Sequence, residues 1–185
     1  AKRFGNRLVI KEMDPLTATV SDIERFLNVL ESRGFTADVL LIDYGDLLTT
    51  ETKRGGDDNR YQEVGGVFGE LRSLTRKRNL VTWIADQPNR GQPQDFDDKR
   101  ARAPLLGLSD TAESYIKPRL TDFWVTINAT LEQIKNHQAE LYVAKNRKYK
   151  TGAVLKIRTD FGRGQFMHKH QPKQEIKPPK VRKAA

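Results

Sequence analysis

The sequence contains no cysteine, and no apolar run in it approaches the length that a helix needs to cross a membrane. The lack of cysteine excludes disulfides and thiolate chemistry, and it fits a reducing compartment. The first twelve residues, AKRFGNRLVIKE, lack the uninterrupted apolar core of a signal peptide. The three histidines, His137, His168 and His170, show no spacing typical of metal ligands, so we interpret them as surface residues. Together these absences predict a cytoplasmic domain with no membrane partner.

Charge is abundant but unevenly distributed along the chain. The 185 residues are enough for one domain with a real core, and they carry a formal net charge of +9. The last eighteen residues, 168–185, contain six Lys or Arg and one Glu, which leaves the body, residues 1–167, with only +4. Because the last residues contain proline and no apolar periodicity, we predict a basic disordered tail there. Its composition fits contact with nucleic acid and simple solvation equally well.

Helical periodicity predicts three helices, at 21–34, about 59–79 and about 109–116. For the first, Ser21 and Glu24 form the pattern of a capping box, and Gly34 is suited to end the helix. The second presents one apolar stripe, made of Val64, Val67, Phe68, Leu71 and Leu74. A long polar loop, 86–108, is predicted between the second and third helices, and loops of that length are usually functional or disordered.

Six short apolar segments are predicted strands: 7–11, 38–43, 80–85, 122–129, 139–145 and 153–159. The second of them, DVLLID, is apolar on both faces, which is typical of a strand covered on both sides in a parallel sheet. The strands first alternate with helices and then follow one another without long helices between them. The predicted fold class is therefore α/β, with a mostly parallel sheet flanked by helices and an antiparallel edge. Such sheets bind ligands beyond the carboxyl ends of their strands.

Three polar features occur where such a ligand would bind. Asp43 ends the apolar strand 38–43, a pattern that orients magnesium in P-loop nucleotide hydrolases, although an acid there also commonly begins a turn. Gln87 follows the next strand, where an amide can sense a γ-phosphate or simply start a polar loop. Lys145 and Arg147 lie two residues apart and therefore on one face of a strand. They fit arginine-finger chemistry at a neighbouring subunit's phosphates, or an ordinary basic hairpin.

The order of these features resembles a known family. The stretches are LLIDY (40–44), NRYQEVGGVFGELRSLTRKRNLVTWIADQPNR (59–90), LSDTAES (108–114) and AKNRKYKTG (144–152). In this order they resemble the RecA-like ATPase domain of DnaB-like ring helicases. The upstream RLVIKEMDP and GFTADVLLIDY make the chain most similar to the replicative helicases of T-even-type phages. The resemblance covers about residues 5–166.

The resemblance implies roles for the polar features. Asp43 resembles the Walker B aspartate, which holds Mg²⁺ through a water molecule, and Gln87 resembles the γ-phosphate-sensing glutamine. Lys145 and Arg147 resemble the lysine and arginine finger that reach the ATP of the adjacent subunit. The family further implies ATP and Mg²⁺ as cofactors, a homo-oligomeric and hexameric ring, translocation on single-stranded DNA, and partnership with a primase and a helicase loader. It places such a protein in the bacterial cytoplasm, including that of a phage-infected host.

The DNA-contacting loop is where the sequence departs from the family. Glu113 and Ser114 match the family's central-channel loop, but the arginine that usually precedes them is replaced by Ala112. We therefore consider Lys117, or Arg119, as a replacement that contacts the DNA phosphates.

A larger departure is the lack of a phosphate-binding loop, since no G-x-x-x-x-G-K-[ST] occurs in the chain. The resemblance implies that this loop, and the glutamate that activates the attacking water, precede residue 1. The chain thus resembles the C-terminal part of a RecA-like core, and such an incomplete core is not expected to turn over ATP alone. Two alternatives stay open. One is a RecA- or KaiC-like recombinase or switch ATPase, and the other is a non-catalytic DNA-binding remnant.

Overall fold

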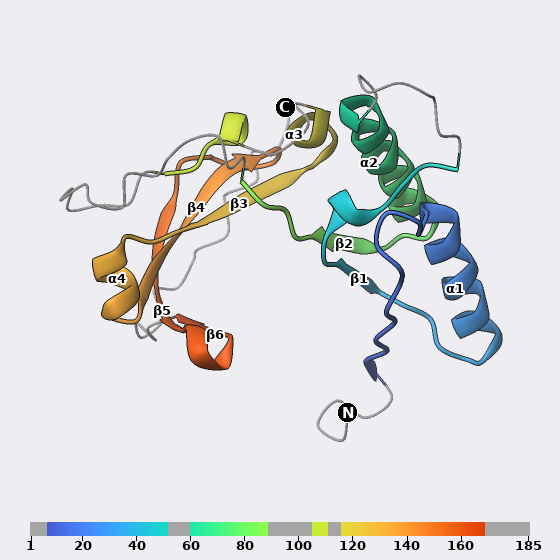
Figure 1. Cartoon of the computed structure of the whole chain (residues 1–185), viewed down its shortest axis with the longest axis horizontal. Coiled ribbons are helices and arrows are strands. Elements are labelled where there is room, and N and C mark those ends of the chain that lie inside the picture. Colours follow the sequence, from blue (N-terminus) through green and yellow to red (C-terminus); the bar gives the residue numbers. More distant parts are fainter. Residues whose placement is uncertain (1–6, 52–59, 89–104, 111–115, 169–185) are drawn as a thin grey trace, which may run out of the picture.

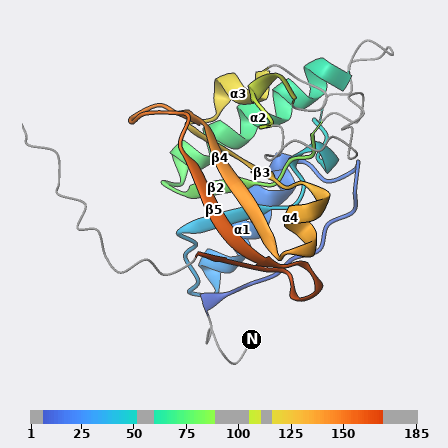
Figure 2. The same cartoon turned by 90° about the vertical axis from the view of Figure 1, so that its left-hand side faces the viewer.

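The computed structural model describes residues 7–51, 60–88, 105–110 and 116–168, and these form two sheets with helices beside them (Figure 1). The first sheet pairs β1 (Val39–Ile42) with β2 (Val81–Ile84) in parallel. The second is antiparallel in the order β3-β4-β5-β6. Its strands are β3 (Phe123–Asn128), β4 (Gln138–Asn146), β5 (Val154–Asp160) and β6 (Gln165–His168). Figure 2 looks onto this second sheet, with β4 and β5 side by side.

Two long helices carry most of the core. They are α1 (Val20–Ser32) and α2 (Arg60–Lys77), and both lie on the same side of β1 and β2 in Figure 1. The predicted apolar stripe of α2 is confirmed, because its five members are at most 4% exposed. Ile23 and Leu27 of α1 join the same cluster, and Leu40, Ile42 and Ile84 of the parallel strands pack against it. The core therefore covers one face of the parallel pair.

The opposite face of the parallel pair is open among the described residues. Four of its side chains are about half exposed or more: Val39 at 52%, Leu41 at 70%, Val81 at 57% and Trp83 at 52%. The prediction that strand 38–43 is covered on both faces is therefore wrong for this chain. The apolar composition of that strand indicated two buried faces, but the described residues supply a cover for only one.

The fold class is mixed α/β, as predicted, but the balance of the sheets differs from the prediction. β1 and β2 are the only strands that pair in parallel in the described ranges, and the antiparallel part is the larger sheet and not an edge. The predicted strand 7–11 is not formed, since residues 8–14 have no regular structure. Ile10 is 85% exposed there, so its segment gains little from burial.

Short elements connect the larger ones. They are the 3₁₀ turns η2 (Gly45–Leu47), η4 (Leu108–Asp110) and η5 (Phe161–Arg163), and the short helices α3 (Ile116–Leu120) and α4 (Leu131–Lys135). Most of the helix predicted at about 109–116 falls on residues 111–115, which lie outside the described ranges; η4 precedes these residues and α3 follows them. Residue 168, the first of the predicted tail, ends β6, and the rest of the tail lies outside these ranges. No helix in the described part of the chain is both long and apolar enough to span a membrane.

The start of α1 differs from the predicted capping box. Thr19 is the N-cap, and its hydroxyl accepts a 3.2 Å hydrogen bond from the Asp22 N–H while the Asp22 carboxylate accepts one of 2.9 Å from the Thr19 N–H. Glu24, which the prediction assigned to the box, instead forms a 2.7 Å ion pair with Lys77 of α2. The predicted end is confirmed: Gly34 has φ +80°, a conformation that favours glycine, and follows the last turn.

Candidate functional site

The carboxyl ends of β1 and β2 lie level with each other, because the strands pair in parallel with Ile42 opposite Ile84. A 2.9 Å hydrogen bond from the Ala85 N–H to the Ile42 carbonyl extends the pairing beyond β2. Asp43 directly follows β1, Gln87 is the third residue after β2, and both are exposed. The two residues therefore lie together at the edge of the sheet that is formed by the carboxyl ends of its strands, which is where the sequence predicted them.

A buried ammonium group accompanies this edge. Lys117 of α3 has 0% of its side chain exposed, and its Nζ lies 2.7 Å from the Asp46 carboxylate and 2.9 Å from Asp86 Oδ1. The same Nζ lies 5.5 Å from the centre of the Phe68 ring. Burying an ionised lysine is costly unless it is paired, so the two carboxylates explain why Lys117 can occupy the interior.

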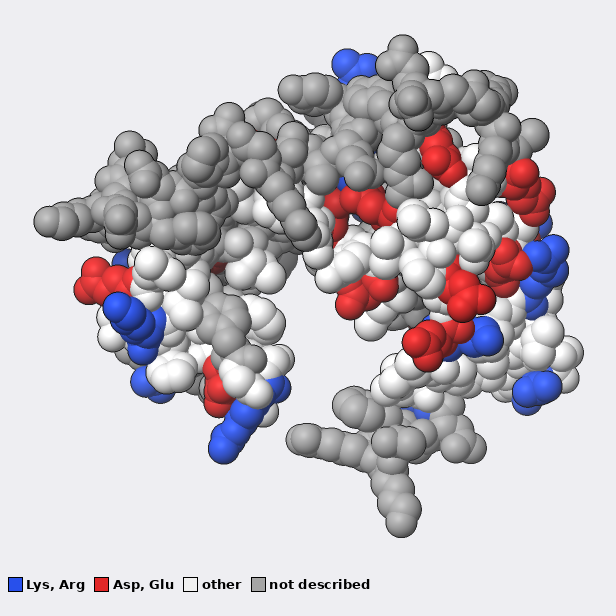
Figure 3. All heavy atoms as spheres, in the orientation of Figure 1, with Lys and Arg blue, Asp and Glu red and all other residues white. Residues whose placement is uncertain are grey.

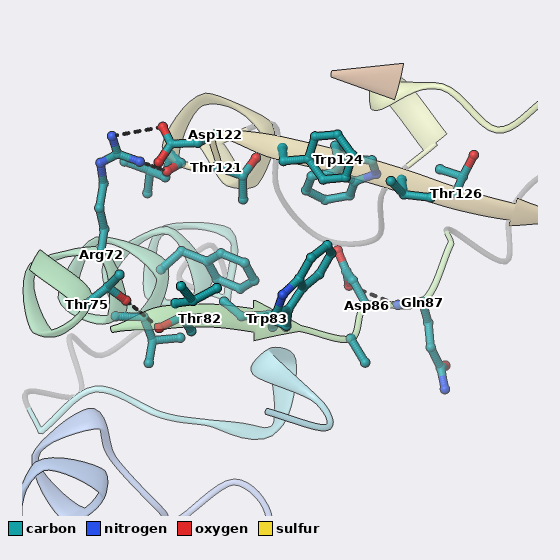
Figure 4. Close-up of a pocket in the computed structure, with 18 of the residues that line it drawn as sticks. Arg72, Thr75, Thr82, Trp83, Asp86, Gln87, Thr121, Asp122, Trp124 and Thr126 are labelled. Atoms are coloured by element: carbon teal, nitrogen blue, oxygen red, sulfur yellow. Dashed lines mark hydrogen bonds and ion pairs between the residues drawn. The ribbon is translucent and has the colours of Figure 1, made fainter. Parts of the chain in front are cut away.

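Asp86 links this ammonium to Gln87. Its Oδ1 accepts a 3.0 Å hydrogen bond from the Gln87 N–H (Figure 4). The same oxygen also accepts the hydrogen bond from Lys117. Burial raises the pKa of Asp86 to about 6, and the nearby Asp46 carboxyl acts in the same direction, whereas Lys117 opposes the shift. The position of the Gln87 backbone therefore depends on a carboxylate that Lys117 helps to keep ionised.

Lys145 and Arg147 both lie against α3. Lys145 Nζ donates to the Pro118 carbonyl, and Arg147 Nη2 donates to the Arg119 carbonyl at 2.8 Å. Arg147 also forms a 3.1 Å ion pair with Asp122, and 45% of its side chain stays exposed. Burial lowers the pKa of Lys145, and the neighbouring Arg147 charge adds to that effect. The two cations thus lie on the same side of the chain, as their spacing predicted. Both donate hydrogen bonds to backbone carbonyls of α3.

The positions of the residues that were predicted to contact DNA do not support such a contact. Glu113 and Ser114 lie outside the described residues. Lys117 is buried and paired, so its ammonium is not available to a nucleic acid, whereas Arg119 is exposed. On the face shown in Figure 3, acidic side chains gather over the half that contains α1 and α2, and the described basic side chains form no continuous surface.

A cavity of about 790 Å³ lies between β2 and β3. In Figure 4 the two strands flank it, and aromatic side chains fill part of the space between them. Trp83 and Phe123 contribute facing rings, which meet edge to face with centroids 6.0 Å apart. In the described ranges β2 pairs only with β1, and β3 only with β4, so two unpaired strand edges border the cavity.

Comparisons with known proteins agree with the family resemblance. Over 142 residues, 76% of this chain, the sequence is 27% identical to a DnaB-like replicative helicase of Enterobacteria phage T4. The chain is similar to part of a DnaB-like replicative helicase. It spans 28% of the T4 protein, a partial coverage that fits the predicted match to the C-terminal part only. No family model matches the chain.

Solved structures share the fold of this chain. One is an ATPase domain that superposes with a TM-score of 0.65 at 20% identity, covering 83% of this chain and 52% of that one. Another is a DnaB-like replicative helicase, studied with its interactions with primase, with a TM-score of 0.65 at 21% identity. The match covers 83% of this chain and 35% of that one. The chain thus spans about half or less of the proteins that it resembles.

DnaB-like helicases use a nucleotide and Mg²⁺. In the described residues no group of three or more His, Cys, Asp or Glu side chains could form a protein cage for a metal. Asp43 is exposed at the sheet edge, whereas Asp46 and Asp86 are held by Lys117. One available carboxylate fits a hydrated Mg²⁺ whose other ligands are water and phosphate oxygens.

Sequence reasoning missed the roles of Asp46 and Asp86. Both follow an apolar strand by a few residues, as Asp43 does, and their partner Lys117 lies far along the chain in the segment IKPRL. The available signal was the lone lysine beside the apolar residues of this segment, which is compatible with a buried cation. A single sequence gives no indication of which carboxylates such a cation would meet.

Proposed function

We propose that the chain is the C-terminal part of the ATPase domain of a replicative DNA helicase. The observation that carries the proposal is the similarity to the phage T4 helicase over 142 residues, which spans three quarters of the chain. The positions of Asp43 and Gln87 at one sheet edge support it, because nucleotide sites of α/β proteins occur at such edges.

In this proposal ATP binds between subunits of a hexameric ring. Asp43 orients Mg²⁺ through a water molecule, and Gln87 senses the γ-phosphate of the same subunit's nucleotide. Lys145 and Arg147 reach the nucleotide of the adjacent subunit, where positive charge stabilises the transition state of phosphoryl transfer. When bound, Mg²⁺ would neutralise part of the phosphate charge. The ring translocates on single-stranded DNA in the bacterial cytoplasm, with a primase and a helicase loader as partners.

A polypeptide beyond the described residues completes the core in this proposal. The sequence contains no phosphate-binding loop, and the parallel pair has one open apolar face and one open edge beside the cavity. Unpaired strand edges and exposed apolar faces are features that native proteins normally cover. The segment that carries the phosphate-binding loop is the cover that we propose.

The test is ATP hydrolysis with Mg²⁺ and single-stranded DNA over a wide range of protein concentration. The chain alone is expected to be inactive, and the chain combined with the phosphate-binding segment is expected to hydrolyse ATP and to unwind a forked duplex. An Asp43→Asn variant of the combined protein should lose both activities. Turnover by the chain alone that disappears in Asp43→Asn would contradict the incomplete site. Strand exchange without unwinding would instead indicate a recombinase.

A further inference from the structure

The helix α3 contacts Lys145 and Arg147 directly, and it contacts the two segments that carry Asp43 and Gln87. On one side, Lys117 holds Asp46 and Asp86, which belong to the segments that carry Asp43 and Gln87. On the other side, the carbonyls of residues 118 and 119 accept hydrogen bonds from Lys145 and Arg147. Only one or two residues of α3 separate the two sets of contacts.

The position of α3 is fixed by α2. A Cβ atom at Gly65 of α2 would lie 2.8 Å from Ile116 Cδ1, so the lack of a side chain there lets α3 approach closely. At the other end of α3, Arg72 donates to the Leu120 carbonyl and forms a 3.3 Å ion pair with Asp122. Because α3 is tied at both ends, the side chain of Lys117 has a defined place from which to reach the two carboxylates.

Loss of the Lys117 ammonium would disturb the Gln87 segment directly. Two carboxyl groups would then share a largely buried space without the cation, so one of them must take up a proton or move away. Asp86 is only 12% exposed and accepts the hydrogen bond from the Gln87 N–H. A change in its charge or position therefore reaches the Gln87 backbone without an intermediate residue.

We propose that Lys117 is a positioning residue for nucleotide hydrolysis. It fixes Gln87 through Asp86, and it joins Asp46 and Asp86 to α3, whose carbonyls place Lys145 and Arg147. Through this one residue, the arrangement at a subunit's own nucleotide is coupled to the two cations directed at its neighbour. The inference rests on the proposed function, and it replaces the predicted contact of Lys117 with DNA.

The experiment uses the chain combined with the phosphate-binding segment and compares Lys117→Met with Arg78→Met. Arg78 is a matched control, because it is also largely buried, at 15% exposure, and joins Glu31 at 2.7 Å and Glu24 at 3.6 Å away from α3. We expect Lys117→Met to lower kcat at least about tenfold while the Kd for ATP changes less than about threefold. Arg78→Met should lower the melting temperature and leave kcat within about twofold.

A second variant covers the case in which Lys117→Met fails to fold. Asp86→Asn keeps the side-chain volume and the oxygen that accepts from the Gln87 N–H, and it removes the charge that pairs with Lys117. It should also lower kcat, but by a smaller factor than Lys117→Met does. An unchanged kcat in whichever of the two variants folds, or an equal fall in Arg78→Met, would overturn the positioning role.

A spectroscopic signature separates positioning from a general loss of structure. In ¹⁵N-labelled chain, Lys117→Met should shift the amide resonances of Gln87 and Arg147 and leave those of β5 unchanged. Unshifted Gln87 and Arg147 signals would overturn the inference. Asp43→Asn distinguishes this failure from failure of the proposed function. If Asp43→Asn is inactive and Lys117→Met is fully active, only the positioning role is wrong, whereas an active Asp43→Asn contradicts the proposed nucleotide site itself.

Discussion

At the scale of single residues, four polar side chains near the carboxyl ends of β1 and β2 differ in burial. Asp43 and Gln87 are exposed, whereas the side chains of Asp46 and Asp86 are 18% and 12% exposed and pair with Lys117. The exposed pair is available to a ligand. The buried pair binds Lys117 and thereby holds the segments that follow β1 and β2 against α3. Sequence position alone would not separate them, because all four follow apolar strands within a few residues.

Arg147 provides the first residue-scale prediction. In the combined protein, Arg147→Ala should lower ATP hydrolysis at least about 100-fold, because a finger arginine stabilises charge in the transition state. The Kd for ATP should change little, since the phosphates are bound mainly by another segment. Steady-state turnover and equilibrium nucleotide binding measure the two effects. Lys148→Ala, at an exposed neighbouring position, is the control for loss of one positive charge. Turnover within a few-fold of wild type in Arg147→Ala would contradict the assignment.

Asp86 provides a prediction about pH. Its folded pKa is raised from 3.8 to about 6, mainly by burial, and Lys117 and Asp46 are the charged groups that face it. A raised acid pKa contributes stability while the group is protonated, and that contribution is lost as the pH rises through about 6. The free energy of unfolding should therefore contain a component that falls between pH 3.8 and about 6. In urea unfolding across this range, the free energy of unfolding should fall less in Asp86→Asn than in the wild type. Identical pH profiles would show that Asp86 is not the cause of the fall.

At the scale of elements, the start of α1 shows the limits of pattern reading. Two overlapping patterns are compatible with a capping box, Thr19 with Asp22 and Ser21 with Glu24, and the sequence does not decide between them. In the structure the first is formed, and Glu24 binds Lys77 of α2 instead. The choice depends on where α2 packs, which is a contact between distant parts of the chain.

The cap yields a prediction with an internal control. Thr19→Ala removes the hydroxyl that accepts from the Asp22 N–H, so it should lower the free energy of unfolding by about 1 kcal/mol. It should also raise the pKa of Asp22 from about 2 toward its ordinary value, because the Thr19 hydrogen bond is the main cause of that low pKa. Ser21→Ala should change stability by less than about 0.5 kcal/mol. Urea unfolding and carboxyl NMR titration measure both effects, and a larger loss in Ser21→Ala would restore the predicted box.

Element types were more predictable than element partners. The helical period of α2 identified its buried stripe correctly, and the apolar segments at β1 to β5 were recognised as strands. The predictions that were wrong concern which other segments each segment pairs with or packs against. Residues 7–11 are apolar but form no strand, and the strand 38–43 has only one covered face in the described residues. Pairing and cover depend on distant segments, and for β1 the cover is absent from the described part of the chain.

At the scale of the whole molecule, the open features lie together on the parallel pair. One face of β1 and β2 exposes four large apolar side chains, and the free edge of β2 borders the cavity that extends to β3. The family resemblance, with its missing phosphate-binding loop, predicted an incomplete core from the sequence. Which surface is left open could not be predicted, because that requires the register of the sheets.

Covering of this face by the phosphate-binding segment makes a prediction about Leu41. In the chain alone its side chain is 70% exposed, so Leu41→Ser should change the free energy of unfolding by less than about 0.5 kcal/mol. In the combined protein the same side chain would be buried, and the substitution should cost about 2 kcal/mol or more. Urea unfolding of both forms measures the difference. Leu27→Ser is the control, because Leu27 is 5% exposed in the chain itself and should destabilise both forms.

The emission of Trp83 gives an independent readout of the same covering. Its side chain is 52% exposed and borders the cavity, so its fluorescence should shift to shorter wavelength when the segment binds. In Trp83→Phe the remaining emission comes from Trp124, which also borders the cavity, so the part of the shift that this variant loses belongs to Trp83. Equal costs of Leu41→Ser in both forms, together with an unshifted emission, would mean that this face stays open in the assembled protein. The proposed completion of the core would then have to take place at the cavity edge of β2 and β3 alone, without cover for the apolar face.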